Sequence, residues 1–314
     1  MTDTGVYVRL DELVALQYKA RGFTFLPRQP IHSILAGRHA SRMRGRGLDF
    51  EEIRGYLPGD DPRTIDWKVT ARTRKPHVRI YTEERDRPAI FVADQRIEMF
   101  FGSKMAMKSV VAAQVAALGA WRVLSMGDRV GAVLFNDSDL VEIRPHRSRR
   151  NVLHILGTLV EMNHALRADS DVVPNPGMLN QALDSILRLA KHDYLITIVS
   201  DFDGIDGETR RLITRLARHN DVIVVPVFDP LSKELPDRGR LVVSDGTLQV
   251  EVDAAKGSIR KKLLETSERR MKSIMEWWEE LAIPVAPLLT DRDPVDQIRE
   301  LLGQTQSQGR ARRR

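Results

Sequence analysis

Cysteine is absent from the sequence, which has 314 residues. This absence excludes a disulfide scaffold, a thiol nucleophile and a thiolate metal site, and it suits a reducing cytosol. No apolar run approaches the roughly 18 residues that a membrane span requires. Residues 1–16 also lack the basic start and long apolar core of a signal peptide. We therefore expect a soluble, cytoplasmic protein without a membrane span.

The common catalytic signatures are absent as well. The sequence contains no P-loop, no G-x-G-x-x-G and no G-x-S-x-G. Its eight histidines are scattered, without the spacing of a metal site. The pair Ser258 and Lys261 has the spacing of a minimal nucleophile and base. It begins a predicted helix, however, where serine is an ordinary cap.

Charge is unevenly distributed along the chain, whose formal net charge is +6. Residues 1–87 carry +5 and the arginines of residues 310–314 carry +4, so the centre of the chain is mildly acidic. Basic arms of this kind can bind nucleic acid or an anionic membrane surface. A solvated surface with a disordered tail over residues 303–314 is the interpretation we favour, and nucleic-acid binding is disfavoured.

Two apolar runs stop abruptly at carboxylates. Ala89–Ala93 ends at Asp94, and Tyr194–Val199 ends at Ser200 and Asp201. Continuous apolar runs of this length are typical of strands that are buried on both faces of a parallel sheet. Ligands bind such sheets beyond the carboxyl ends of the strands. Asp94 and Asp201 are therefore candidate site residues.

The rest of residues 89–228 alternates between strands and helices, which predicts an α/β fold with a doubly wound, mostly parallel sheet. The predicted helices are Lys104–Leu124, Arg149–Leu166, Met178–Ala190 and Glu208–Arg218. The remaining predicted strands are Val130–Phe135 and Leu140–Ile143, joined as a hairpin, and Val222–Phe228.

The pattern changes after Pro230. Arg240–Val252 is predicted to form a small added hairpin, and Ser258–Leu281 a long helix. Val285–Leu288 is a candidate strand for the main sheet, and Asp293 is a predicted cap of a last helix that ends at Leu302. The predicted division of the chain is an N-terminal arm over residues 1–87, an α/β domain over residues 88–302, and the tail.

Charged residues are densest in Phe50–Arg79. Asp61 is placed to cap a helix that begins at Pro62, with Asp66 and Trp67 one turn further on. Charges so closely spaced favour a network that docks one segment onto another. Acid–base chemistry is the less favoured alternative, because no histidine or serine partner stands at a fixed spacing.

This segment resembles the signature of the bacterial family catalogued as domain of unknown function 58, and the similarity runs from about Gly45 to at least Asp201. The resemblance implies a von Willebrand factor A-like (Rossmann-like) fold that follows an N-terminal signature segment. Members of this family are typically encoded beside MoxR-type AAA+ ATPases and are thought to act as their partners, with no established enzymatic activity. The matching residues are Arg54, Tyr56, Pro58, Gly59, Asp60, Asp61, Arg63, Asp66, Trp67 and Arg72.

Many von Willebrand A domains hold Mg²⁺ through an Asp-x-Ser-x-Ser run, a threonine and a second aspartate. This chain keeps Asp94 and Asp201 at the matching positions, but Arg96 and Glu98 replace the serines. The loop expected to supply the threonine, residues 175–179, contains none. Because an arginine is permanently charged and repels a divalent ion, we expect a metal-free site in which Arg96 pairs with Asp94 or Asp201.

Two alternatives to a metal-free site remain open. Asp94, Glu98, Asp201 and Asp203 are four carboxylates that would bind Mg²⁺ if they converged. Asp94 and Asp201 would otherwise only cap the helices that follow or accept from loop amides.

The resulting expectation is a non-enzymatic interaction protein with a degenerate metal-ion-dependent adhesion site. It would need no cofactor, and its partners would be a MoxR-type ATPase and an unknown client. One alternative is a divalent-metal-dependent hydrolase that uses the four carboxylates at the strand ends. A weaker alternative is nucleic-acid binding through the basic arm and tail.

Overall fold

The computed structural model describes residues 5–20, 48–83, 87–232, 240–244, 249–253, 270, 272–277 and 280–301. The chain divides into two compact units: Pro30–Asp86, and Met1–Gln29 together with Arg87–Arg314. The structure therefore corrects the predicted grouping of residues 1–87, because the first helix belongs to the larger unit.

A six-stranded sheet forms the centre of the larger unit, in the order β10-β7-β6-β3-β4-β5. All neighbours are parallel except β4 and β5, which form the predicted antiparallel hairpin. Counted along the chain within this sheet, the order is 3-2-1-4-5-6, that of a doubly wound fold. The strands are β3 (Ala89–Asp94), β4 (Val130–Phe135), β5 (Leu140–His146), β6 (Leu195–Ser200), β7 (Asp221–Phe228) and β10 (Leu288–Leu289).

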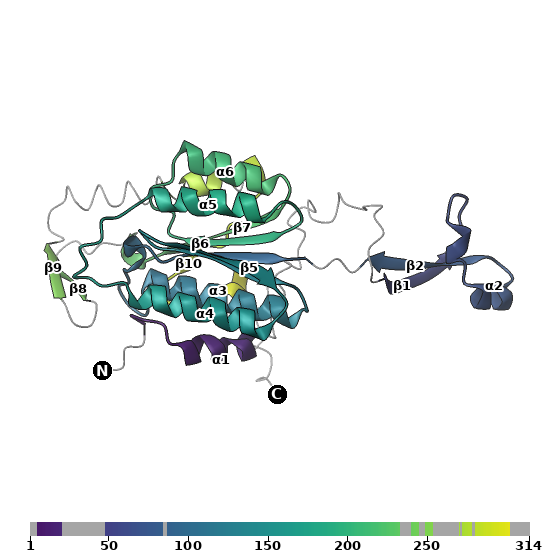
Figure 1. The fold of residues 1–314 in the computed structure, drawn as a ribbon, viewed down its shortest axis with the longest axis horizontal. Coiled ribbons are helices and arrows are strands. Elements are labelled where there is room, and N and C mark those ends of the chain that lie inside the picture. Colours follow the sequence, from purple (N-terminus) through teal and green to yellow (C-terminus); the bar gives the residue numbers. More distant parts are fainter. Residues whose placement is uncertain are drawn as a thin grey trace, which may run out of the picture. The chain divides into compact units, whose positions relative to one another are not determined.

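Helices cover both faces of this sheet (Figure 1). On one face lie α1 (Leu10–Ala20), α3 (Lys108–Ser125), α4 (Arg149–His164) and α8 (Pro294–Leu301). On the other face lie α5 (Gly177–Leu189) and α6 (Gly207–Ala217). The predicted helices of this region are thus confirmed, apart from shifts of a few residues at their ends.

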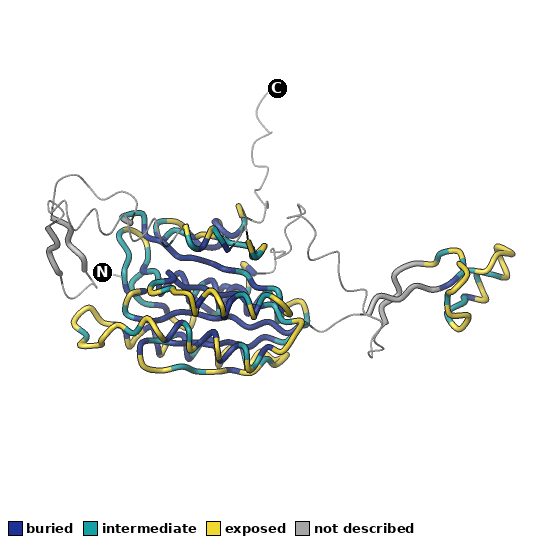
Figure 2. The backbone as a smooth tube through the Cα atoms, turned by 90° about the horizontal axis from the view of Figure 1, so that it is seen from above, coloured by how far each residue is buried: buried dark blue, intermediate teal, exposed yellow. Residues whose placement is uncertain are grey.

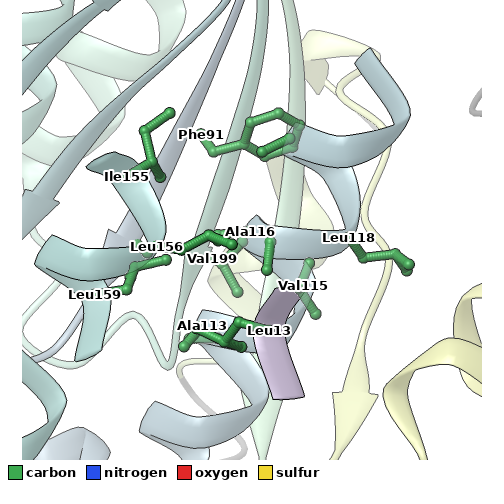
Figure 3. Close-up of a cluster of buried hydrophobic side chains, with 14 of the residues drawn as sticks. Leu13, Phe91, Ala113, Val115, Ala116, Leu118, Ile155, Leu156, Leu159 and Val199 are labelled. Atoms are coloured by element: carbon green, nitrogen blue, oxygen red, sulfur yellow. The ribbon is translucent and has the colours of Figure 1, made fainter. Parts of the chain in front are cut away.

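The strands are buried between these two helical layers (Figure 2). In β3, Phe91 and Ala93 face the layer that contains α3, whereas Ile90 and Val92 face the layer that contains α5. Figure 3 shows the first of these clusters, in which Phe91 and Val199 lie among side chains of α1, α3 and α4. Burial on both faces explains why the strand sequences are continuously apolar.

The first helix packs on α3 and α4, within the larger unit. Leu13, Leu16 and Ala20 are buried in the core of the larger unit. The indole of Trp121 donates a hydrogen bond to the carbonyl of Leu13 at 2.9 Å. The segment before α1 is held too, because Val8 N donates to Asn163 Oδ1 at 2.9 Å.

The C-terminal elements agree with the prediction where the structure describes them. β8 (Arg240–Ser244) and β9 (Gln249–Asp253) are antiparallel, and the turn between them lies outside the described residues. Residues 272–277 are helical, whereas residues 258–269 of the predicted long helix lie outside the described part. β10 joins the sheet beside β7, as expected, and Asp293 Oδ1 accepts from Val295 N at 2.7 Å to cap α8. The predicted tail also lies outside the described residues.

The smaller unit is a hairpin with a helical connection. β1 (Leu48–Gly55) and β2 (His77–Glu83) pair antiparallel, and neither strand was predicted. Their connection contains a short 3₁₀ helix, η1 (Pro62–Thr64), and α2 (Trp67–Thr73). Asp61 caps η1, as predicted, and Asp66 caps α2 by accepting from Lys68 N and Val69 N at 3.0 and 3.1 Å.

Among the helices that the structure describes, none has the length and the apolar character needed to cross a membrane.

The close approach of α3 to β3 depends on Gly119. A methyl group at this position would overlap the ring of Phe91. We expect Gly119→Ala to lower the free energy of unfolding by about 1–3 kcal/mol, measured by chemical denaturation, because the core has no space for it. The matched control is Gly157→Ala in α4, where a methyl meets nothing within 4 Å. That change should raise stability by about 0.5–1 kcal/mol, and equal effects of the two changes would contradict this account.

Candidate functional site

An ion pair between Asp94 and Arg96 lies at the carboxyl end of β3. Arg96 Nε lies 3.1 Å from both carboxylate oxygens, and its Nη2 lies 2.7 Å from Asp94 Oδ2. The backbone N–H of Arg96 also donates to Asp94 Oδ1 at 2.9 Å. The two side chains are 0% and 1% exposed, respectively. The pairing of Arg96 with Asp94 that the sequence predicted is present.

The remaining contacts of this pair come from other loops. Ser200 Oγ, at the end of β6, donates to Asp94 Oδ2 at 2.6 Å. The guanidinium donates to the carbonyls of Pro176 at 3.4 Å and Asp203 at 3.3 Å. Its carbon lies 5.7 Å from the ring centre of Phe135, within cation–π range. The guanidinium therefore joins the loops that follow β3, α4 and β6.

Two further features fix these loops. Asp137, in the turn between β4 and β5, accepts from Ile97 N at 2.6 Å and from Asn175 N at 2.9 Å. Gly204 has a φ of +73° and lies so close to Pro176 that a methyl group would overlap it. Glycine is required there by both the backbone conformation and the close approach.

A second buried carboxylate, Asp201, follows β6. Lys108 Nζ lies 2.5 Å from Asp201 Oδ2, and Arg270 Nη1 lies 3.5 Å from the same oxygen. Arg96 Nη2 is more distant, at 3.9 Å from Asp201 Oδ1. Asp203 forms an ion pair with Arg270. The site is thus a network of ion pairs. Asp94 pairs with Arg96, and Asp201 pairs mainly with Lys108 and Arg270.

The charges of this network shift the pKa values of its members. Burial acts to raise the pKa of Asp201, but the charges of Lys108 and Arg270 outweigh it and hold that pKa below its usual value. Burial likewise acts to lower the pKa of Arg96, and the neighbouring Asp94 charge reverses this and raises the pKa. The pKa of Glu98 is raised by the partial loss of water around its carboxyl group and by the charges of Asp203 and Asp201.

The donor set does not fit the magnesium ion that a von Willebrand A domain would hold. Both oxygens of Asp94 accept hydrogen bonds from Arg96, and the Ser200 hydroxyl points its proton at Asp94. Asp201 and Asp203 are paired with cations, and Glu98 is exposed. Within the described residues, no three His, Asp or Glu side chains are grouped so as to hold a metal ion. The four predicted carboxylates therefore do not converge as ligands.

Some members of the network were not predicted from the sequence. Ser200 was noted only as the end of a strand, although its place beside Asp201 was a usable signal. Lys108 is 93 positions from Asp201 in the sequence and Arg270 is 69 positions from it, so no local pattern could associate them. Asp137 lies in a turn that was predicted to be polar. No sequence pattern indicated that its carboxylate accepts hydrogen bonds from two other loops.

The signature residues lie in the smaller unit, where most of them are structural. Arg54 donates to both oxygens of Asp60, at 2.8 and 2.9 Å, and Asp60 also accepts from Leu57 N at 2.8 Å. Tyr56 N donates to the carbonyl of Pro76 at 2.9 Å, and Gly59 has a φ of +107° in the turn. These contacts are local to the hairpin unit, and the Arg54–Asp60 pair is the ion pair among them. Pro58, Arg63, Trp67 and Arg72 are exposed.

The strand order, with one antiparallel hairpin at the edge, defines a doubly wound α/β domain in which a hairpin unit lies between α1 and the first sheet strand. The family model described as "Protein of unknown function DUF58" matches residues 52–273. The chain belongs to this family.

The chain is similar to several proteins and solved structures. An uncharacterized protein of Mycobacterium tuberculosis H37Rv, Rv1480, is 30% identical over 273 residues, which cover 85% of this chain and 82% of the relative. A conserved hypothetical protein, BatB from Bacteroides thetaiotaomicron, matches 70% of this chain and 100% of its own, with a TM-score of 0.39 and 10% identity. A von Willebrand factor type A structure from Catenulispora acidiphila covers 73% of this chain and 43% of its own, with a TM-score of 0.32 and 9% identity.

Removal of the Arg96 guanidinium should be costly. Arg96→Ala leaves the Asp94 carboxylate buried and uncompensated, so we expect the free energy of unfolding to fall by about 3–5 kcal/mol in chemical denaturation. The control is Arg188→Ala, which breaks an exposed pair with Asp184. It should cost at most about 1 kcal/mol. If the free energy of unfolding falls by a similar amount in the two variants, the buried pair does not stabilise the protein more than an exposed pair does.

Asp201 should make the protein sensitive to acid. Its pKa is lower in the folded protein than in the unfolded chain, so its stabilising contribution is present at neutral pH and is lost as the pH falls through the folded pKa. We expect the unfolding free energy of the wild type to decline between about pH 5 and 3 more steeply than that of Asp201→Asn. If the unfolding free energies of the two proteins depend on pH in the same way, the lowered pKa of Asp201 is contradicted. Asp169→Asn, at an exposed position, controls for the loss of a carboxylate.

Proposed function

We propose that this chain is a non-enzymatic interaction module that links a MoxR-type AAA+ ATPase to a client protein. The observation that carries the proposal is the buried Arg96 guanidinium, which is held by Asp94 at the point where the sheet changes direction. In doubly wound folds this crevice, between β3 and β6, is where ligands bind. Here the crevice holds a side chain of the chain itself.

In this proposal the adhesion site is degenerate, and Arg96 supplies the positive charge that a divalent ion supplies elsewhere. The guanidinium donates hydrogen bonds to both carboxylate oxygens of Asp94 and to the carbonyls of Pro176 and Asp203. The three loops therefore keep one arrangement without a metal ion or a cofactor. A preformed loop surface suits recognition, because little conformational entropy is lost when a partner binds.

The recognition surface consists of the loops Asp94–Ser103, Pro174–Met178 and Asp201–Gly207, which the guanidinium and Asp137 hold together. Beside them Val173 is 81% exposed and Val172 is 47% exposed, so apolar side chains are available for contact. Glu98 is exposed and has no hydrogen-bond or ion-pair partner among the residues described. The surface combines apolar contact area with a carboxylate that is free to meet a partner.

The network supports an interaction role over hydrolysis. A hydrolase would need a nucleophile or metal-bound water beside a group able to transfer a proton. Asp94, Asp201 and Asp203 are each paired with a cation. The proposal also places the chain in the cytoplasm, because an AAA+ ATPase works where ATP is supplied.

The partnership is tested with purified proteins. Full-length chain and the MoxR-type ATPase of the same organism are combined, and their association is measured by isothermal titration calorimetry with a non-hydrolysable ATP analogue present. We expect a complex with a Kd in the micromolar range or below, which is typical of specific interfaces. Absence of association with the ATPase in every nucleotide state would overturn the adaptor role.

Metal independence is a separate prediction. Titration of the chain alone with Mg²⁺ or Mn²⁺ should release no binding heat, and chelator should leave its thermal unfolding temperature unchanged, because Arg96 already neutralises Asp94. Sub-millimolar metal binding that disappears in Asp94→Ala would refute the degenerate site. Asp169→Ala, which removes an exposed carboxylate paired with Arg167, serves as the control for non-specific binding.

A further inference from the structure

The smaller unit presents a short helix, α2, that contacts β2 and leaves most of its side chains exposed. None of the seven residues of α2 is buried. Trp67, its first residue, is 69% exposed, and Leu57 and Ile53 on the same hairpin unit are 59% and 37% exposed. Large apolar side chains gathered on a small unit in this way mark interaction sites. Tryptophan in particular is enriched among the residues that dominate binding energy.

The same unit carries cations that have no carboxylate partner. All five are exposed, and none has an ion pair within the described part of the chain. They are Arg63, Lys68, Arg72, Arg74 and Lys75. By contrast, Arg54 of this unit is paired with Asp60. The unpaired cations therefore lie on α2 and its flanks.

The local structure holds α2 in place without burying it. Asp66 caps its first turn, and Arg74 ends it with a φ of 55°, in the left-handed region that non-glycine residues rarely adopt. Lys68 and Arg72 stand four residues apart, so their like charges face each other and oppose the helix. A seven-residue helix is not stable from its own hydrogen bonds. The caps maintain a short, repulsive and uncovered helix, and an anionic partner would relieve that repulsion.

We propose that α2 docks on a protein partner that offers an acidic surface with an apolar pocket for the Trp67 indole. This inference rests on the proposed function, under which that partner is the ATPase and the loop surface of the larger unit is left for the client. Charge complementarity sets the class of partner: exposed Lys and Arg surround one apolar anchor. A protein fits better than single-stranded nucleic acid, which requires several aromatic side chains on which bases stack. The other exposed large apolar residues described in this unit, Leu57 and Ile53, are aliphatic.

The test uses the full-length chain and the purified MoxR-type ATPase, with Kd measured by calorimetry. Trp67→Ala is expected to weaken binding at least tenfold, and Lys68→Glu/Arg72→Glu is expected to do the same. The matched control, Arg215→Glu/Arg218→Glu, changes the net charge equally on exposed positions of α6 and its C-terminus and should leave Kd within twofold. Wild-type affinity should fall as salt rises, and that dependence should be smaller in the Lys68→Glu/Arg72→Glu variant.

The outcomes separate this proposal from the adaptor role. If the wild type binds the ATPase and the α2 variants bind equally well, the docking surface is wrong and the adaptor role stands. If the wild type does not bind, both fail. Each variant is first checked for an unchanged thermal unfolding temperature, which α2 permits because it buries no side chain.

A photo-crosslinking amino acid at position 67 gives an independent readout that does not depend on a loss of affinity. A crosslink to the ATPase supports the proposal. A crosslink within the chain itself would show that the larger unit covers Trp67 and would overturn it. Binding of a labelled single-stranded RNA that is lost in Trp67→Ala, with ATPase binding unchanged, would also overturn it in favour of nucleic acid.

Discussion

A positive charge buried beside β3 is the constraint on which the candidate site depends. Arg96 is 1% exposed, and a guanidinium removed from water to that extent is tolerated only with a carboxylate and further acceptors around it. Asp94 and the carbonyls of Pro176 and Asp203 provide them. The loops that follow β3, α4 and β6 must therefore stay close together for the charge to be stable. These electrostatic contacts hold the three loops together at this edge of the sheet.

The two units use charge in opposite ways. In the larger unit, Arg96, Lys108 and Arg270 are largely withdrawn from solvent and are neutralised by three aspartates. In the smaller unit, the carboxylates Asp60, Asp61 and Asp66 accept hydrogen bonds from backbone amides. Most of the cations whose side chains are described there have no carboxylate partner. The signature of the family thus has two physical roles. Its acidic residues stabilise the connection between β1 and β2, with Arg54 paired to Asp60, whereas Arg63, Arg72 and Trp67 are exposed.

Elements could be predicted from the sequence where their burial produces a recognisable local pattern of apolar residues. Strands buried on both faces are continuously apolar, so β3, β6 and β7 were predicted together with the polar residues at their ends. The carboxylates Asp94 and Asp201 could be assigned to one edge for the same reason. β1 was missed because it is a charged strand in a two-stranded unit, where Glu51, Glu52 and Arg54 interrupt any apolar pattern. Lys108 and Arg270 could not be assigned, since only the folded chain brings them to Asp201.

The position of α1 has a consequence for how the chain acquires its structure during synthesis. The ribosome releases this helix before α3 and α4, which form its binding surface, and Val8 bonds to a side chain 155 positions further on. The strands β1 and β2 pair with each other, and both precede the first strand of the main sheet. The helix must therefore wait with Leu13 and Leu16 uncovered until α3 and α4 have been made. In the cell, that interval is when the nascent chain is most open to capture by a chaperone.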